Sequence, residues 1–460
     1  MSPCSISIGS TATCMRTARS PTRMVKYSLT VLGGAGRVDS RAPHPDVKAS
    51  ASQQQVSETR FAFFTDSLGN PSRPSFQPLS IVARSPLPPL LYADTATSSD
   101  QLYFSGVEVH DPFIAFGLGR RRVTLQSALE FGRVKKAGTF DRVLPLEAWR
   151  ARAEARWPRR QISPAEIIAE VAKAHRIRGF RVADDFPTSL FLRLRALGVH
   201  LELAAGPLFP EREVKSPAEA AALREGNRLS AVGLAAAEAA LRAARPSGRY
   251  LVTRGRRLTS EDVKFAVESA ILRAGGISLS TIIAGGDQAC DPHDRGSGPL
   301  RAHDLIVVDI FPRVIATGYF GDMTRTFLRG RASDAQRRLV ATVRAAQFAA
   351  LKAIRAGVDG RFVHQQASET FTAAGYETKR TENGSVGFIH GTGHGVGLAI
   401  HEMPRLSGLV SMKLKRGAVV TVEPGLYYPG LGGCRIEDVV QVTDRGSKML
   451  SNYHYAWELR

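Results

Sequence analysis

Four apolar segments in the second half of the chain each carry one carboxylate. Asp309 stands in LIVVDIFP, Asp322 in GYFGDMTRTF, Glu423 in VVTVEPGLYY and Glu437 in CRIEDVVQV. These apolar, β-branched runs predict buried strands. A lone carboxylate inside such a strand is costly unless it has a partner. Because too few lysines and arginines stand nearby to pair all four acids, the pattern predicts a site for cations.

The stretch from Asp309 to Asp322 contains Pro312 and Gly318, so it can fold back as a hairpin and bring both acids to one place. A histidine would complete a set of ligands that is rich in oxygen and poor in nitrogen. Such a set, shared between two ions, suits two-metal hydrolysis, in which a bridging water becomes hydroxide near neutral pH.

The segment HGTGHGVGLAIHE, residues 390–402, holds three histidines and four glycines. It is not an HExxH zinc motif, because Met403, Pro404 and Arg405 follow His401-Glu402. It does not fit GxGxxG either, which excludes the dinucleotide-binding motif. The glycines instead predict a backbone that passes close to a ligand or a metal cluster.

The chain divides by composition into three parts. Residues 1–86 are rich in Ser, Thr, Pro, Gln and Arg and show no sustained period, so we expect a disordered extension or a mis-assigned start, with a transit peptide as a further alternative. Residues 87–210 alternate short strands and helices and predict a small αβ domain. In residues 216–460, long helices at about 261–274, 333–356 and 361–374 alternate with strand pairs, which predicts an α+β domain. The tetrapeptide SPAE opens a helix at Ser163 and again at Ser216.

The net charge of +20 comes from basic residues spread along the chain. Without an RNP-like aromatic segment, a zinc finger or a long basic run, we interpret it as a solvated basic surface and expect no nucleic-acid partner. No apolar run approaches the ~18–20 residues of a bilayer span, so no membrane association is expected. The four cysteines form no CxxC pair; they suit a reducing compartment, and we predict a cytoplasmic protein.

Five stretches, in this order, resemble the metallopeptidases of the pita-bread fold: DPHDRGSGPL, VVDIFPRVIATGYFGDMTRTF, HGTGHGVGLAIHE, VVTVEPGLYY and RIEDVV. Within that group they are most similar to the Xaa-Pro aminopeptidase and Xaa-Pro dipeptidase (prolidase) branch, which the creatinases also join. The resemblance implies a pita-bread (creatinase/aminopeptidase-like) catalytic domain over 216–460 and a creatinase-like N-terminal αβ domain over 87–210.

Carried over by position, the resemblance implies five metal ligands. Asp309 would bind the first metal, Asp322 and Glu437 would bridge both, and His394 and Glu423 would complete the second. One histidine among four carboxylates favours Mn²⁺, with Co²⁺ and Zn²⁺ as alternatives.

The same resemblance implies catalytic roles around these ligands. His293, His390 and His401 would line the substrate pocket and stabilise charge on the scissile carbonyl, and Glu423 would also handle the proton of the attacking hydroxide. Arg435 would meet a substrate carboxylate or, alternatively, only neutralise the acids. Thr324 would support the ligands, whereas the aromatic residues around 319–327 and 426–428 are expected in the core.

The resemblance implies a binuclear metalloexopeptidase that hydrolyses Xaa-Pro bonds in peptides with proline at the second position, and a homodimer. Dipeptidase and aminopeptidase both remain open. The thirteen-residue step from Asp309 to Asp322, two longer than is usual in the family, leaves the substrate preference open as well. The alternatives are a methionine-aminopeptidase-like enzyme, a creatinase-like hydrolase without metals, and a non-catalytic pita-bread module that binds RNA or ribosomes.

Overall fold

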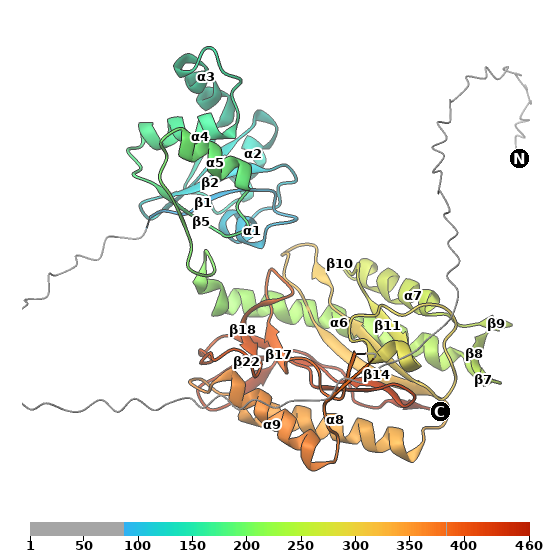
Figure 1. The fold of residues 1–460 in the computed structure, drawn as a ribbon. Coiled ribbons are helices and arrows are strands. Elements are labelled where there is room, and N and C mark those ends of the chain that lie inside the picture. The colour runs from blue at the N-terminus through green and yellow to red at the C-terminus, as the bar shows by residue number, and fades with distance from the viewer. Residues whose placement is uncertain (1–86, 383) are drawn as a thin grey trace, which may run out of the picture. The chain divides into compact units, whose positions relative to one another are not determined.

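A computed structural model describes residues 87–382 and 384–460 of the chain (Figure 1). The extension predicted for residues 1–86 lies outside the described residues. Among the residues described, no helix combines the length and the apolar character needed to cross a membrane.

The first part of the described chain is a small mixed αβ structure, as predicted. Its four-stranded sheet has the order β1-β2-β3-β4, and β5 and β6 form a separate parallel pair. The strands are β1 Leu90–Ala93, β2 Phe113–Leu118, β3 Arg121–Gln126, β4 Arg142–Pro145, β5 Phe180–Val182 and β6 Leu201–Leu203; the helices are α1 Ser99–Ser105, α2 Ala128–Ala137, α3 Leu146–Arg156, α4 Pro164–Ala174 and α5 Thr188–Ala196.

Both SPAE tetrapeptides form the capping boxes that the sequence predicts. The Ser163 side chain caps α4 and the Ser216 side chain caps α6 (Pro217–Ala243), each with a glutamate three residues later that bonds back to the serine N–H. The first helical position is proline in both, where the missing N–H costs nothing. Three residues separate the 3₁₀ turn η1 (Pro210–Glu213) from helix α6, so the predicted boundary before Ser216 coincides with a helix start.

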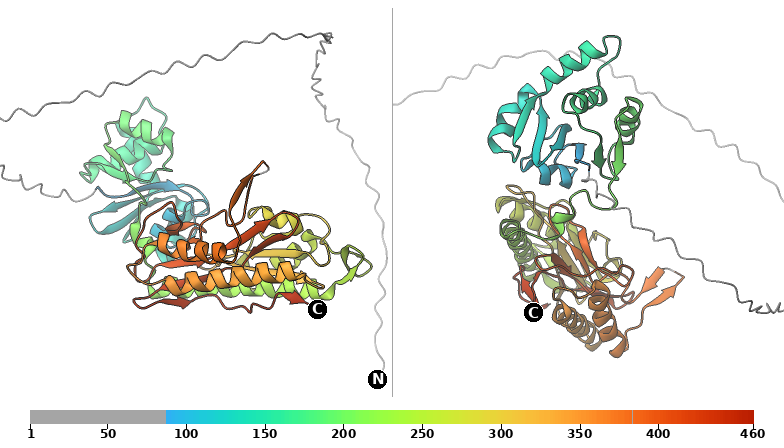
Figure 2. Two further views of the ribbon diagram at one scale, coloured as in Figure 1. Left: turned by 60° about the horizontal axis from the view of Figure 1, so that its bottom comes forward. Right: turned by 90° about the vertical axis from the view of Figure 1, so that its left-hand side faces the viewer.

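The second part contains two sheets that lie between two pairs of helices. Helices α6 and α7 (Ser260–Arg273) pack together on one side and α8 (Asp334–Ala353) and α9 (Gly360–Ala373) on the other, as Figures 1 and 2 show. One sheet has the order β11-β12-β14-β24 and the other β18-β17-β19-β22-β23. Their strands are β11 Ile282–Gly285, β12 Leu305–Ile310, β14 Met323–Arg329, β24 Glu458–Leu459, β17 Gly393–Gly395, β18 Glu402–Leu406, β19 Val419–Val422, β22 Asp438–Val442 and β23 Ser447–Met449.

Smaller strands complete this part: β20 (Gly425–Tyr428) pairs with β21 (Gly432–Arg435) as a hairpin, and the rest lie at the periphery. They are β7 Arg245–Ser247, β8 Tyr250–Thr253, β9 Arg256–Arg257, β10 Gly276–Ile277, β13 Arg313–Val314, β15 Lys379–Thr381 and β16 Gly384–Val386, with a second 3₁₀ turn, η2, at Gly286–Cys290.

The apolar clusters are separate in the two parts. Two clusters of buried residues lie wholly within 90–209, and the other four lie wholly within 223–459. A core of its own is what a domain requires. We therefore keep the division into 87–210 and 216–460 as a proposal, and the separate clusters support it.

Strand register brings the four acids together, although only Asp309 lies inside a strand as predicted. Strands β12 and β14 form the predicted hairpin, with Asp309 opposite Thr324. The prediction is wrong for the other three acids: Asp322 precedes β14, Glu423 lies between β19 and β20, and Glu437 lies between β21 and β22. After Glu423, Pro424 has no N–H with which to continue the ladder. Because Val422 pairs with Asp438, Glu423 and Glu437 are the next residues outward at one sheet end.

Candidate metal centre and its pocket

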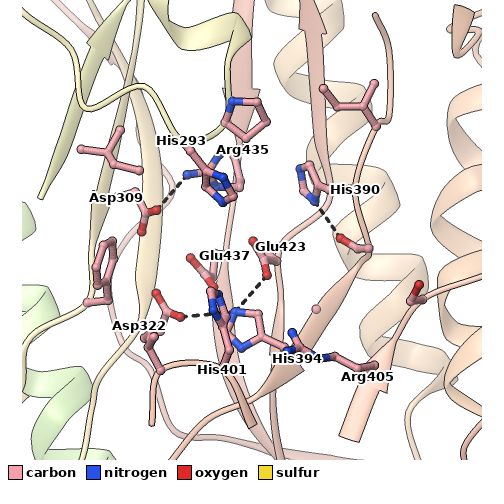
Figure 3. Close-up of a pocket in the computed structure, with 18 of the residues that line it drawn as sticks. His293, Asp309, Asp322, His390, His394, His401, Arg405, Glu423, Arg435 and Glu437 are labelled. Atoms are coloured by element: carbon pink, nitrogen blue, oxygen red, sulfur yellow. Dashed lines mark hydrogen bonds and ion pairs between the residues drawn. The ribbon is translucent and has the colours of Figure 1, made fainter. Parts of the chain in front are cut away.

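All nine residues that the sequence predicts for the site line one cavity of about 660 Å³. Figure 3 shows that they come from both sheets and from the loops between strands. They are His293, Asp309, Asp322, His390, His394, His401, Glu423, Arg435 and Glu437.

Three of these side chains form a compact group that could hold a metal ion. Asp322, His394 and Glu437 each offer one ligand atom, and these atoms all lie within 4.8 Å of one another. His394 donates from Nδ1 to the carbonyl of Gly395 (3.0 Å), which leaves Nε2 aimed at Asp322 Oδ2, 3.7 Å away (Figure 3). Thr324 Oγ1 donates to Glu437 Oε2 at 2.6 Å and fixes that carboxylate, as predicted for Thr324.

Glu423 joins the group through the histidine. Its Oε1 lies 3.2 Å from His394 Nε2 and accepts a hydrogen bond from Thr421 Oγ1, also 3.2 Å. Burial raises the pKa of Glu423, but the hydrogen bond and charge of His394 outweigh it and lower that pKa to about 2. Glu423 is therefore anionic at neutral pH.

Asp309 is turned toward an arginine. Its Oδ2 accepts a hydrogen bond from Arg435 Nη2 at 2.8 Å, and its buried Oδ1 has no partner among the described residues. A buried carboxylate oxygen without a donor costs free energy. Oδ1 is thus suited to a cation.

The charges of the acids also fit cations. Burial, followed by the neighbouring carboxylates, raises the pKa of Asp322 and of Glu437 well above the ordinary values. Burial likewise raises the pKa of Asp309, against the opposing charge of Arg435. Divalent ions would remove this mutual repulsion. The donor set, four carboxylates and one imidazole, therefore fits hard divalent metals.

A hydrogen-bonded chain runs from Asp309 to His390 through a residue that the sequence analysis assigned to the core. Arg435 donates from Nη1 to the hydroxyl of Tyr427 (3.0 Å), and this hydroxyl lies 2.8 Å from His390 Nε2. Burial lowers the pKa of His390, and its Nδ1 donates to the carbonyl of Gly391, so the neutral ring accepts a hydrogen bond from the Tyr427 hydroxyl at Nε2. Tyr427 is fully buried, as predicted, but its hydroxyl belongs to the site.

The pairing of β20 with β21 explains this series of hydrogen bonds. Gly425 lies opposite Arg435, so Tyr427, two residues along β20, shares a sheet face with Arg435. That relationship was readable only once the hairpin was known. Of the two roles predicted for Arg435, its bonds to Asp309 and Tyr427 support neutralisation of the acids, because the side chain is 4% exposed and its guanidinium is already engaged.

The remaining two histidines are more open. His293 lies in the loop after η2, and its exposed ring lines the cavity. The rings of His401 and His394 meet edge to face, with centroids 4.4 Å apart. Burial and the nearby His394 and Arg405 lower the pKa of His401 to about 4. It is a neutral imidazole at pH 7.

Arg405 is a cavity residue that the sequence analysis did not single out. It follows Pro404 in β18 and lines both the main cavity and a neighbouring cavity of about 380 Å³, which also shares His401. Within residues 87–382 and 384–460 its guanidinium has no ion pair. No spacing in the sequence marks this arginine, because only the antiparallel pairing of His394 with Arg405 brings it here.

The glycines of HGTGHGVGLAIHE let β17 pack between two strands. A Cβ at Gly393 would lie 2.0 Å from the carbonyl oxygen of Thr421, and one at Gly395 would lie 2.1 Å from that of Met403. Neither contact is sterically allowed. The predicted close approach is to neighbouring backbone, which places His394 between β18 and β19.

Comparisons with known proteins agree with this geometry. The profile of metallopeptidase family M24 matches residues 221–444. An Xaa-Pro dipeptidase of Pyrococcus furiosus is 38% identical over 175 residues, which are 38% of this chain and 47% of that protein. A protein of Mycobacterium tuberculosis with the name "Probable dipeptidase PepE" is 34% identical over 274 residues, 59% of this chain and 67% of that protein.

Solved structures share the fold over most of the described chain. The crystal structure of an X-Pro aminopeptidase from Thermotoga maritima superimposes with a TM-score of 0.66 and 22% identity, covering 80% of this chain and 97% of that one. The match extends beyond the segment 221–444 to the smaller αβ part. The predicted α+β, pita-bread architecture is therefore confirmed.

Proposed function

The chain belongs to metallopeptidase family M24, and from this premise we propose that it is a metal-dependent exopeptidase that hydrolyses the bond between an N-terminal residue and a following proline. The observation that carries the proposal is the convergence of five potential metal ligands and three histidines on one cavity. The names of its relatives, an Xaa-Pro dipeptidase among them, support proline as the second residue.

Asp309, Asp322, His394, Glu423 and Glu437 would hold two divalent metals, which we propose to be Mn²⁺ because the set has one nitrogen and four carboxylate ligands. Bound there, divalent ions would polarise the scissile carbonyl and lower the pKa of the attacking water. Arg435 offsets part of the negative charge through its bond to Asp309. We also propose that the protein is cytoplasmic and that it forms a homodimer.

The protein's own groups would perform the remaining steps. Glu423, anionic at neutral pH, would accept the proton of the attacking water and pass it to the proline nitrogen as the C–N bond breaks. His401 and His293 would donate hydrogen bonds to the scissile carbonyl as it gains charge. Both ring nitrogens of His390 are engaged, so we assign to it the orientation of Tyr427 and Arg435.

Arg405 is suited to meet the substrate carboxylate, a role that we predicted for Arg435. It lines the cavity without an ion pair from the described residues, whereas Arg435 is buried against Asp309. In an Xaa-Pro dipeptide the carboxylate follows the scissile bond by one residue. A dipeptide would therefore pair with Arg405, and a longer peptide would carry its carboxylate beyond this side chain.

The test of this assignment compares two substrates in two proteins. In Arg405→Met, the specificity for Xaa-Pro should fall by about tenfold or more, since a charged hydrogen bond is worth roughly 1.5–3 kcal/mol. The specificity for an Xaa-Pro-Yaa amide, which lacks the carboxylate, should change little. Equal losses for both substrates would exclude carboxylate recognition by Arg405.

A further inference from the structure

Glu402 closes the histidine-rich segment, and the site described above gives it no role. Its side chain is 7% exposed and does not line the main cavity, although His401 before it and Arg405 after it do. A glutamate that is almost wholly removed from water requires partners.

Those partners come from the linker that precedes α6. Lys215 Nζ, on a side chain 1% exposed, donates to Glu402 Oε2 at 2.8 Å, and Arg212 donates from Nη2 to Oε1. Arg212 pairs at the same time with Asp100 of α1. The carboxylate thus joins two cations that are some 190 residues away in the sequence.

The linker is itself held against the sheet that carries His394. Lys215 donates its backbone N–H to the carbonyl of Gly417 (3.0 Å), and Val214 forms a β-bridge with Ala418 just before β19. The Lys215 ammonium also donates to the carbonyl of Arg212. Lys215 therefore presents its charge from a fixed backbone position.

On the other side, the carboxylate shapes the turn that contains His401. Glu402 Oε1 accepts the backbone N–H of Ala399 at 2.9 Å, which closes residues 399–402 into a tight turn. A Cβ at Gly397 would lie 2.5 Å from Glu402 Oε2, so the carboxylate fills the space beside that glycine. The bond from Ala399 therefore ties the anchored carboxylate to the backbone on the other side of His401.

We propose that Glu402 is a positioning residue, which sets the place of the His401 imidazole in the cavity by anchoring the 399–402 turn to Lys215 and Arg212. The proposal rests on the proposed function only for the statement that His401 contacts the substrate. A buried ion pair of this kind contributes a defined geometry more than net stability.

The kinetic test is a double-mutant cycle between Glu402 and His401. Glu402→Gln keeps the shape of the side chain and removes its charge. It should lower kcat/KM for an Xaa-Pro substrate by about tenfold or more, since small misplacements of a catalytic group are costly. In a His401→Ala background the same substitution should cost less than about twofold, because the group it positions is gone. Equal losses in both backgrounds would overturn the proposal.

A control variant and a conservative variant separate positioning from general damage. Glu170→Gln makes the same substitution in an ion pair of α4, where the Glu170 side chain is 11% exposed and bonds to Arg152 and Arg156. It should leave kcat/KM unchanged. Glu402→Asp keeps the charge on a shorter side chain, so this variant tests the position of the carboxylate alone. It should remain folded and still lose activity. Full activity in this variant would contradict the proposal.

A spectroscopic measurement decides the proposal even if the protein proves not to be a peptidase. With ¹³C-labelled histidine, the Cε1–H signal of His401 is assigned by its loss in His401→Ala. Glu402→Gln and Lys215→Met should both shift this signal, and Glu170→Gln should not. A His401 signal that stays in place in both site variants would overturn the proposal. Absence of hydrolysis by the wild-type protein would instead overturn the proposed function alone.

Discussion

Arg435 and Asp309, which stand 126 residues apart in the sequence, form a buried ion pair with 2.8 Å between Nη2 and Oδ2. The pair uses one oxygen of the carboxylate and leaves the other, Oδ1, without a donor among the described residues. Arg435 therefore stabilises the charge of Asp309, while Oδ1 of Asp309 stays available for a cation.

Removing the arginine should destabilise the metal-free protein. In Arg435→Met the Asp309 charge would remain buried without compensation, and breaking a buried pair in this way costs about 3–5 kcal/mol. Urea unfolding of chelated protein measures the change. Arg416→Met is the matched control, because the Arg416–Asp444 pair is largely exposed and should contribute less than about 1 kcal/mol. Equal effects of the two substitutions would contradict the role given to Arg435.

The Tyr427 hydroxyl should matter for both activity and stability. Tyr427→Phe leaves His390 Nε2 and Arg435 Nη1 without their shared partner. The free energy of unfolding should fall by about 1–3 kcal/mol, the cost of an unsatisfied buried group, and kcat should fall with it. Tyr428→Phe is the control, since its exposed hydroxyl bonds only to the carbonyl of Glu377. If kcat falls equally in both variants, the chain from Arg435 to His390 has no catalytic importance.

Gly393 should not tolerate a side chain. Alanine there would place Cβ 2.0 Å from the Thr421 carbonyl oxygen and push His394 out of the sheet. We expect Gly393→Ala to lower metal affinity, measured by calorimetry, by at least tenfold. Gly132→Ala, in α2 with no atom near its added Cβ, should leave metal affinity intact and should not lower stability, because alanine favours a helix over glycine by about 1 kcal/mol. Normal metal binding in Gly393→Ala would mean that β17 does not fix His394.

The sequence predicted which residues lie in this site better than it predicted the contacts that strand pairing creates there. The acids within apolar runs and the ordered motifs pointed to nine residues that line the cavity, because a buried charge stands out in an apolar segment. Arg405 and the Tyr427 hydroxyl were missed, since each reaches the site only through strand pairing between distant segments. Glu423 and Glu437 were expected inside strands, yet they lie at strand ends, where side chains from two sheets can meet.

The clustered acids predict a pH-dependent loss of stability in the metal-free protein. The pKa of Asp322 is raised in the folded state, mainly by burial and by Glu437. The folded protein then holds a proton that the unfolded chain has released, so the free energy of unfolding falls as pH rises above the ordinary value of 3.8. Compared with Asp322→Asn, chelated wild-type protein should lose stability progressively as the pH rises above 3.8.

Adding Mn²⁺ should abolish this pH-dependent loss of stability in the wild-type protein, because the cations compensate the charge of the ionised carboxylates. Melting temperatures of both proteins, with and without metal, measure the effect across pH. A wild-type protein that gains stability relative to Asp322→Asn as pH rises would show that Asp322 has another favourable partner in the absence of metal.

The most direct test of the central claim is hydrolysis of Xaa-Pro and Xaa-Pro-Yaa peptides, with Xaa-Ala peptides as controls, by metal-stripped protein before and after Mn²⁺ is added. The account predicts cleavage that depends on metal, is confined to proline substrates, and falls by several orders of magnitude in Asp322→Ala. The ratio of dipeptide to tripeptide rates then separates dipeptidase from aminopeptidase. No turnover by folded wild-type protein with any divalent metal would contradict the account.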